Sequence, residues 1–200
     1  ESVREEIRRH RENKTFLPEV ELSAQLTPYN DLGTVVADKD LILVVVPSHH
    51  VRYVAAEMAP RLAENALIVS ASKGIENQTF LTMTQVLAEE LNQTPPGNFC
   101  VLSGPSFATE VARHVPTVVT VASSELQVAQ KVQQIFATPY FRVYTIDDTI
   151  GVELGGSVKN VIAIAAGIID GLGLGLNTRA ALITRGQTEI RRLGVKMGAN

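Results

Sequence analysis

The stretch Glu153–Asn177, ELGGSVKNVIAIAAGIIDGLGLGLN, carries the most regular pattern in this chain of 200 residues. Its apolar residues recur at helical intervals, which predicts one long helix that runs into a glycine-broken loop. Lys159 lies in the middle of this helix, with Gly155 and Gly156 one turn before it and Ala163 one turn after. Because glycine inside a helix costs roughly 1 kcal/mol relative to alanine, the pair indicates a packing or functional requirement.

Two interpretations of Lys159 are compatible with this spacing. The side chain could run along a buried helix and reach solvent with its ammonium group. Alternatively, the small residues around it keep one face open to a backbone or a ligand, and a lysine enclosed there could exchange a proton. The spacing alone does not decide between them.

Upstream of this helix, strand-like runs alternate with helix-like segments. The β-branched run 40–47 predicts a strand buried on both faces, as in a parallel sheet. Further strands are expected at 66–70, 99–102, 117–121 and 141–145, with a possible short one at 19–27. Helices are expected at 2–11, 31–37, 48–58, 78–91, 106–113 and 125–136, with Asp31, Ser48 and Ser106 as N-caps. This alternation predicts an α/β fold with a doubly wound, Rossmann-like sheet.

After Asp147 and Asp148 the pattern becomes purely helical, so we predict an α/β domain over 1–147 and the beginning of an all-α domain over 148–200. A dinucleotide-binding domain carries G-x-G-x-x-G after its first strand. The only similar run, Gly171–Leu176, has the wrong spacing and follows a helix. With no initiator methionine and a start inside a predicted helix, the chain is expected to be a fragment of a longer protein, whose first strand and glycine loop would lie upstream.

Composition restricts the class of protein. The net charge is −3 and basic residues form no block, which argues against a nucleic-acid partner. The apolar run 161–169 is shorter than the roughly 20 residues of a membrane span, so none is expected. Cys100 is the only cysteine, which excludes an internal disulfide and fits a reducing cytoplasm. No metal site is expected, because the adjacent His49 and His50 would point about 100° apart on a helix.

Three turns follow predicted strands, at 46–50, 70–75 and 102–110. Ligands of open α/β sheets bind outside the carboxyl ends of the strands, so each turn is a candidate binding segment as well as an ordinary connection. In the third turn, Gly104 would let a ligand approach the backbone closely.

Two segments, GPSFATEVA at 104–112 and GSVKNVIAIAAGIIDGLGLGLN at 156–177, resemble the NAD(P)-dependent glycerol-3-phosphate dehydrogenases of bacterial type. The resemblance extends over essentially the whole chain. It implies that Lys159 is the proton donor and acceptor. It also implies substrate contacts at Lys73, Gly104, Ser106 and Lys159, and cofactor contacts at Lys73, Ala108 and His50.

The same resemblance implies a cytoplasmic homodimer that interconverts sn-glycerol 3-phosphate and dihydroxyacetone phosphate with NAD or NADP and supplies phospholipid synthesis. Residues 1–147 would then be part of an NAD(P)-binding domain, and 148–200 the start of an α-helical substrate and dimerisation domain. The glycine loop and the family's later Arg-Asn pair are not in the chain, so the segment alone is expected to be inactive. Two alternatives stay open: another dehydrogenase with a Rossmann domain and an α-helical domain, acting on a hydroxy acid or sugar acid, or a non-catalytic nucleotide-binding module.

Overall fold

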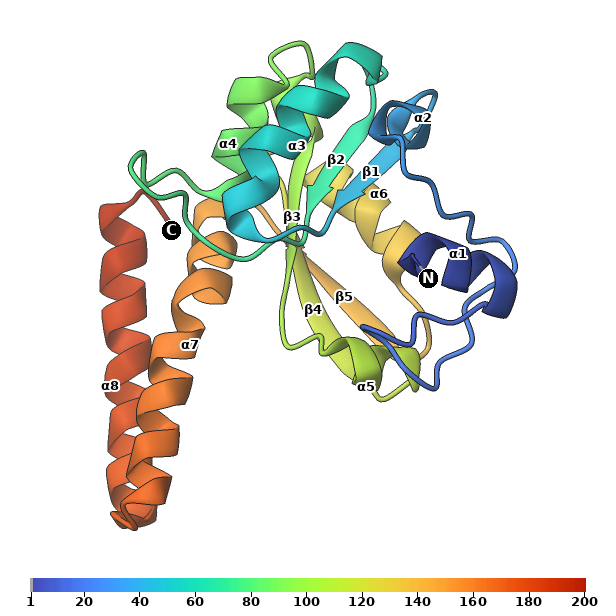
Figure 1. Ribbon diagram of the computed structural model, residues 1–200. Helices are drawn as coiled ribbons and strands as arrows, with labels where there is room; N and C mark the ends of the chain where they lie inside the picture. Colours follow the sequence, from blue (N-terminus) through green and yellow to red (C-terminus); the bar gives the residue numbers. More distant parts are fainter. Residues whose placement is uncertain (1) are drawn as a thin grey trace.

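A computed structural model describes residues 2–200 and contains a five-stranded sheet flanked by helices (Figure 1). The strands are β1 (Leu41–Val44), β2 (Leu67–Ser70), β3 (Phe99–Ser103), β4 (Thr117–Ala122) and β5 (Phe141–Ile146), in the spatial order of the sequence. β1, β2 and β3 run parallel, β4 is antiparallel to β3, and β5 is parallel to β4. The α/β class is confirmed, with one reversal that makes the sheet mixed rather than purely parallel.

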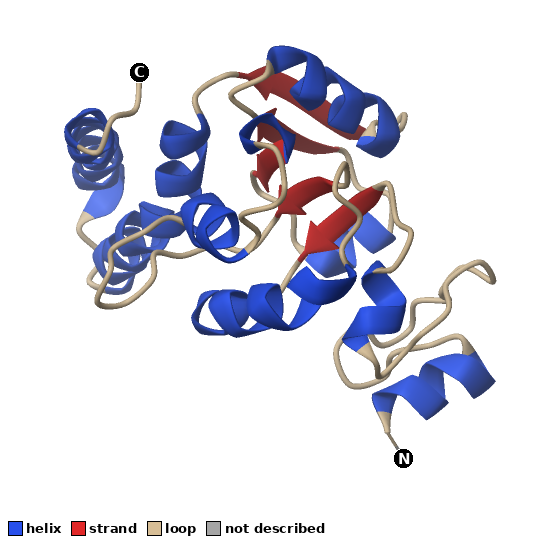
Figure 2. Cartoon of the chain, turned by 90° about the horizontal axis from the view of Figure 1, so that it is seen from above, coloured by secondary structure: helices blue, strands red, loops and turns tan. Residues whose placement is uncertain are grey.

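Helices cover both faces of the sheet, as the view from above shows (Figure 2). The helices before the last strand are α1 (Val3–His10), α2 (Leu32–Val36), α3 (Val51–Met58), α4 (Met83–Glu90), α5 (Ala108–Ala112) and α6 (Leu126–Phe136). Successive strand residues point to opposite faces. Accordingly, Ile68 of β2 joins a core with α3 and α4, while the next residue, Val69, joins a second core with α6. Cys100 is fully buried in that second core.

The prediction that 40–47 is buried on both faces is wrong. β1 ends at Val44 and lies at the edge of the sheet formed by residues 2–200. Ile42 and Val44 are buried, whereas Leu43 is 42% and Val45 63% exposed. An edge strand that is packed on one face shows this alternation, which a run of uniformly apolar residues conceals.

Several predicted boundaries also differ. Asp31 caps α2 as expected, since its carboxylate accepts the N–H of Thr34 at 2.7 Å. Ser48 does not cap α3, because residues 48–50 form a 3-10 turn and the N-cap is His50. α4 begins at Met83 rather than at 78, since Gln78 and Phe80 have positive φ angles that a helix cannot contain. The possible strand at 19–27 is absent, and the N-cap of α5 is Phe107 rather than Ser106.

The long helix that contains Lys159 is α7 (Thr149–Gly171), whose N-cap is Asp148. The glycine-rich segment after it is not a loop that reaches residue 177. Instead, the chain reverses at Leu172–Leu174 and enters α8 (Gly175–Lys196), which packs antiparallel to α7 (Figure 1). Gly173 and Gly175 have φ angles of 66° and 80°, and this left-handed backbone allows the tight reversal.

By length and composition, α7 could also cross a membrane, which the shorter apolar run 161–169 did not indicate. Its most apolar window has a mean hydropathy of 1.5, and 17% of that window is buried. Core helices of soluble proteins pass the same test, so one such helix is weak evidence for a span. The exposed apolar residues Val161, Ile164 and Ile168 follow helical spacing along α7.

Candidate functional site

A cleft of about 260 Å³ lies where the carboxyl end of β3 meets the first turns of α7. It is lined by Ser103, Gly104, Pro105, Thr120, Gly151, Val152, Gly155, Gly156 and Lys159. Lys159 is half-buried there. Pockets for drug-sized ligands usually measure about 300–1,000 Å³, so this cleft suits a small ligand.

The two glycines before Lys159 have different roles. A Cβ on Gly156 would collide with Oγ of Ser103, so the hydroxyl would have to rotate or α7 would have to move away from the end of β3. A Cβ on Gly155 would meet nothing within 4 Å, and that position borders the cleft. Gly155 keeps space open beside the cleft, and Gly156 lets α7 pack against the end of β3. Together they place Lys159 beside the turn after β3.

Lys73 reaches the same turn from the loop after β2. Its ammonium donates a hydrogen bond to the carbonyl oxygen of Gly104 at 3.0 Å. Partial burial and, secondly, the positive charge of Lys159 lower the pKa of Lys73 below its usual value. The two ammonium groups therefore lie within electrostatic reach of each other.

Gly104 lines the cleft and is also needed for the packing of the sheet. A Cβ at this position would lie 2.8 Å from the carbonyl oxygen of Val118 and 2.9 Å from Cα of Val119. The backbone of β4, which runs antiparallel beside β3, is thus the close neighbour on the side where a Cβ would lie. A bulky side chain at Gly104 would disturb the sheet before it disturbed binding.

Lys73 and the other predicted residues, Ser106, Ala108 and His50, lie outside the lining of the cleft. Ser106 is exposed on the same turn, and its Oγ donates to the carbonyl oxygen of Gly104 at 3.4 Å. Ala108 is the exposed first residue of α5. His50 ends the turn after β1, and the centroid of its ring lies 4.1 Å from that of His49. Of the predicted residues, Gly104 and Lys159 line the cleft, and Lys73 and Ser106 both donate to the carbonyl oxygen of Gly104.

The sequence reasoning missed Ser157 and Glu153, which hold α7 against the sheet domain. Ser157 Oγ accepts the backbone N–H of Gly74 at 3.0 Å and donates to the carbonyl oxygen of Glu153 at 2.7 Å. The carboxylate of Glu153 accepts the N–H of Thr84 at 2.8 Å and its hydroxyl at 2.5 Å, at the N-terminus of α4. A lone acidic residue in the apolar run GVELGG was the available signal for Glu153.

Glu153 is 5% exposed. Burial raises the pKa of this carboxyl above its ordinary value, and the hydrogen bonds from Thr84 oppose the shift. The positive end of the α4 dipole and the N–H donors compensate part of the cost of burying the charge.

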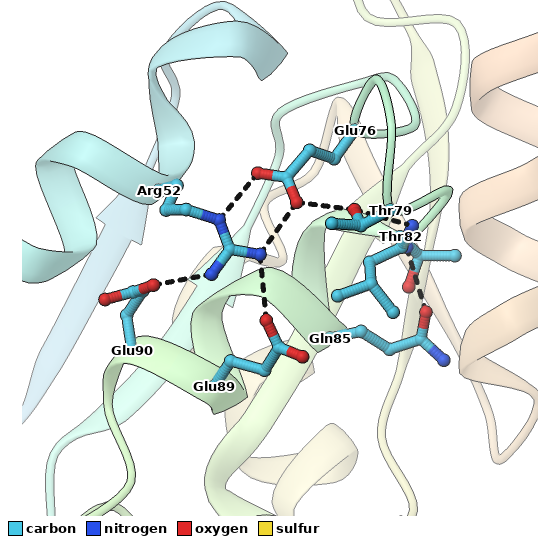
Figure 3. Close-up of polar contacts among 8 residues, drawn as sticks. Arg52, Glu76, Thr79, Thr82, Gln85, Glu89 and Glu90 are labelled. Atoms are coloured by element: carbon cyan, nitrogen blue, oxygen red, sulfur yellow. Dashed lines mark hydrogen bonds and ion pairs between the residues drawn. The ribbon is translucent and has the colours of Figure 1, made fainter.

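Arg52 was also missed, since nothing in the sequence shows its partners. It lies in the first turn of α3 and binds the carboxylates of Glu76, Glu89 and Glu90 (Figure 3). This ion cluster joins α3 to α4 and to the loop that follows β2.

Neither a metal nor a reactive thiol is indicated in the described part of the chain. Among residues 2–200, no three His, Cys, Asp or Glu side chains gather in a group that could hold a metal ion. Burial raises the pKa of the Cys100 thiol to about 11, so it stays protonated and unreactive near neutral pH.

Two family descriptions match most of the chain. Residues 1–129 match the family described as the N-terminus of NAD-dependent glycerol-3-phosphate dehydrogenase, and residues 148–200 match its C-terminus. The chain is 55% identical over 197 residues to glycerol-3-phosphate dehydrogenase [NAD(P)+] of Syntrophobacter fumaroxidans, and the match covers 97% of the chain and 57% of that protein. It is 54% identical over 195 residues to the protein of the same description from Geobacter metallireducens, with 98% and 58% covered.

Solved structures give the same picture. The crystal structure of glycerol-3-phosphate dehydrogenase from Coxiella burnetii has a TM-score of 0.90 and 41% identity, with 99% of this chain and 60% of that chain covered. The glycerol-3-phosphate dehydrogenase of Saccharomyces cerevisiae has a TM-score of 0.86 and 29% identity, with 97% and 57% covered. The chain thus spans less than two thirds of the length of these relatives.

Proposed function

Since this chain belongs to the NAD-dependent glycerol-3-phosphate dehydrogenase family, we propose that the full-length enzyme interconverts sn-glycerol 3-phosphate and dihydroxyacetone phosphate with NAD(H) or NADP(H). By full-length enzyme we mean a protein that carries these 200 residues together with the flanking segments of the relatives. The observation that carries the proposal is that Lys73 and Lys159 both lie at the Gly104 turn: Lys73 bonds to the carbonyl oxygen of Gly104, and Lys159 lines the cleft together with Gly104.

Lys159 lines the cleft and Lys73 bonds to the Gly104 turn that borders it, and two ammonium groups in this arrangement favour an anionic ligand. Like charges repel, and the lowered pKa of Lys73 reflects part of this repulsion. A phosphorylated triose in the cleft would relieve it and would accept charge-assisted hydrogen bonds. The size of the cleft, about 260 Å³, is suited to a three-carbon substrate rather than to a dinucleotide.

In this proposal Lys159 is the acid-base group. When the carbonyl is reduced, negative charge develops on the C2 oxygen of the substrate, and an ammonium held beside it stabilises that charge and donates the proton. In the oxidation direction, the neutral amine takes the same proton back. Lys73, together with Gly104 and Ser106 on the neighbouring turn, would hold the substrate.

The cofactor would lie at the carboxyl ends of the parallel strands, where α/β sheets bind such groups. His50, Lys73 and Ala108 follow β1, β2 and β3 in turn, and all three are exposed at that edge. These residues fit one end of a dinucleotide, and we propose that they contact it. The bound nicotinamide supplies the hydride acceptor or donor for C2 of the substrate.

We also propose a division into an NAD(P)-binding domain, 1–147, and the start of a helical substrate and dimerisation domain, 148–200. The boundary between the two matched family regions and the purely helical character of α7 and α8 support it. A cytoplasmic homodimer with no membrane span that supplies glycerol 3-phosphate for phospholipids is consistent with the family and with a single free cysteine.

The test is a steady-state assay of the full-length enzyme with NADH and NADPH. Dihydroxyacetone phosphate should be reduced with a kcat/KM at least about 10²-fold above that for an unphosphorylated keto acid. Preference for the keto acid would favour another dehydrogenase, and cofactor binding without turnover of either compound would favour a non-catalytic nucleotide-binding module.

A further inference from the structure

We propose that Arg52 is a positioning residue, which acts through Glu76 to hold the loop that carries Lys73. The effect of this contact on the substrate KM rests on the proposed function of the cleft. Arg52 itself lines no part of the cleft.

The contact between Arg52 and Glu76 has the geometry of a paired fork. Nε of Arg52 donates to Oε1 of Glu76 at 2.8 Å, and Nη2 donates to Oε2 at 2.7 Å (Figure 3). Two parallel bonds fix the orientation of both groups, which a single ion pair does not. The side chain of Glu76 is only 17% exposed, so solvent competes weakly for the carboxylate.

The same guanidinium is anchored to α4. Nη1 donates to Oε1 of Glu90 at 2.5 Å, and Nη2 donates to Oε2 of Glu89 at 2.8 Å. Arg52 is therefore held by two helices, its own and α4, before it binds Glu76. It presents a fixed surface to the loop instead of a mobile side chain.

The loop between β2 and α4 is folded around Glu76. Residues 71–82 contain no helix or sheet strand, but the N–H of Glu76 donates to the carbonyl oxygen of Leu81 at 2.9 Å, and Ile75 bridges Thr82. The hydroxyl of Thr79 donates to the second carboxylate oxygen of Glu76 at 2.6 Å. The carboxylate thus connects the loop internally and connects it to Arg52.

Lys73 is three residues from Glu76, and the backbone between them is constrained. Gly74 donates its N–H to Ser157, and a Cβ on Gly74 would lie 2.5 Å from Cβ of Ser48. The segment that follows Lys73 is thus held by Ser157 at Gly74 and by Arg52 at Glu76, so loss of the Glu76 contact would release one of the anchors that set the origin of the Lys73 side chain. Because a lysine ammonium is carried by a flexible stem, its position depends on that origin.

The test compares Glu76→Gln with Glu89→Gln in the full-length enzyme. Both variants remove one carboxylate charge from the same Arg52 nitrogen, but Glu76 belongs to the loop, whereas the side chain of Glu89 is 55% exposed and Glu90 still anchors the guanidinium to α4 without it. For Glu76→Gln we expect the KM for dihydroxyacetone phosphate to rise about tenfold with kcat within about threefold, since a small misplacement weakens binding while Lys159 is untouched. For Glu89→Gln we expect both constants within about twofold of the parent enzyme.

Hydrogen exchange of the peptide that covers 71–82 gives a second readout that needs no turnover. Glu76→Gln should speed its exchange and Glu89→Gln should not. An unchanged exchange rate in Glu76→Gln, or faster exchange with an unchanged KM, would overturn the inference. If the parent enzyme does not reduce dihydroxyacetone phosphate, the proposed function fails, while the exchange comparison still decides whether Glu76 holds the loop.

Discussion

The backbone N–H of Gly74 donates a hydrogen bond to the hydroxyl of Ser157 at 3.0 Å, although the two residues are 83 positions apart in the sequence. Gly74 follows Lys73, and Ser157 precedes Lys159 by two residues on α7. This bond therefore joins the backbone segments that carry the ammonium groups of Lys73 and Lys159.

Ser157→Ala should weaken catalysis and, to a smaller extent, stability. It leaves the N–H of Gly74 without its acceptor, at a cost of about 1 kcal/mol, which corresponds to a Tm lower by about 2–4 °C. Because the loop then shifts relative to α7, kcat/KM of the full-length enzyme for dihydroxyacetone phosphate should fall about tenfold. Thr188→Ala is the matched control, since its hydroxyl donates to the carbonyl of Thr184 within α8 and far along the chain from the cleft. Equal kcat/KM values in the two variants would contradict this prediction.

Three glycines of α7 should respond differently to alanine. Gly167→Ala should raise the unfolding free energy of the 200-residue chain by about 0.5–1 kcal/mol, since its Cβ meets nothing within 4 Å. Gly156→Ala should lower it, because the new methyl group meets Ser103. In the full-length enzyme, Gly155→Ala should gain the same helix stability and raise the substrate KM, since the methyl group enters the cleft. Denaturant titration and steady-state assays check these results, and a Gly156→Ala chain as stable as Gly167→Ala would refute the packing role.

Lys159→Met should lower kcat of the full-length enzyme by about 10²–10⁴-fold, the usual effect of removing a general acid-base group. Methionine keeps much of the length of the side chain, so the helix should stay folded. The affinity for NADH, measured by calorimetry, should change little. If kcat stays within a few-fold of the parent value, Lys159 is a structural lysine that reaches solvent, and the assignment fails.

Glu153→Gln should change how stability depends on pH. The folded-state pKa of Glu153 lies above the ordinary value of 4.5, so the folded protein binds more protons than the unfolded chain between these two values, and stability falls as pH rises through that window. Glutamine keeps an oxygen for the N–H of Thr84 and has no charge to bury. We expect the variant to gain unfolding free energy relative to the parent at about pH 8 and to lose that advantage at about pH 4. A difference that stays constant across this range would contradict it.

Local signals predicted much of the fold. The helical period fixed α7 around Lys159, the side chain of Asp31 predicted the start of α2, and the β-branched runs located the strands. Those signals act over a few residues, so they are visible in the sequence. The resemblance supplied the candidate roles of Lys73 and Gly104.

What the sequence did not reveal depends on segments that meet only in the folded chain. Arg52 and Glu76, and Ser157 and Gly74, are partners across loops, and no local pattern marks such pairs. The exposure of Leu43 depends on which strand lies at the edge of the sheet. The packing of Gly104 against β4 was not expected, because the antiparallel neighbour cannot be read from the turn itself.

The open edge of β1 has a practical consequence for the 200-residue chain produced without flanking sequence. Within residues 2–200, no strand pairs with the side of β1 that faces away from β2, and Leu43 and Val45 are exposed beside it. Such an edge is a template for pairing with a second molecule. Light scattering should then show reversible association that grows with concentration. Self-association through this edge will therefore set the highest concentration at which the 200-residue chain can be studied.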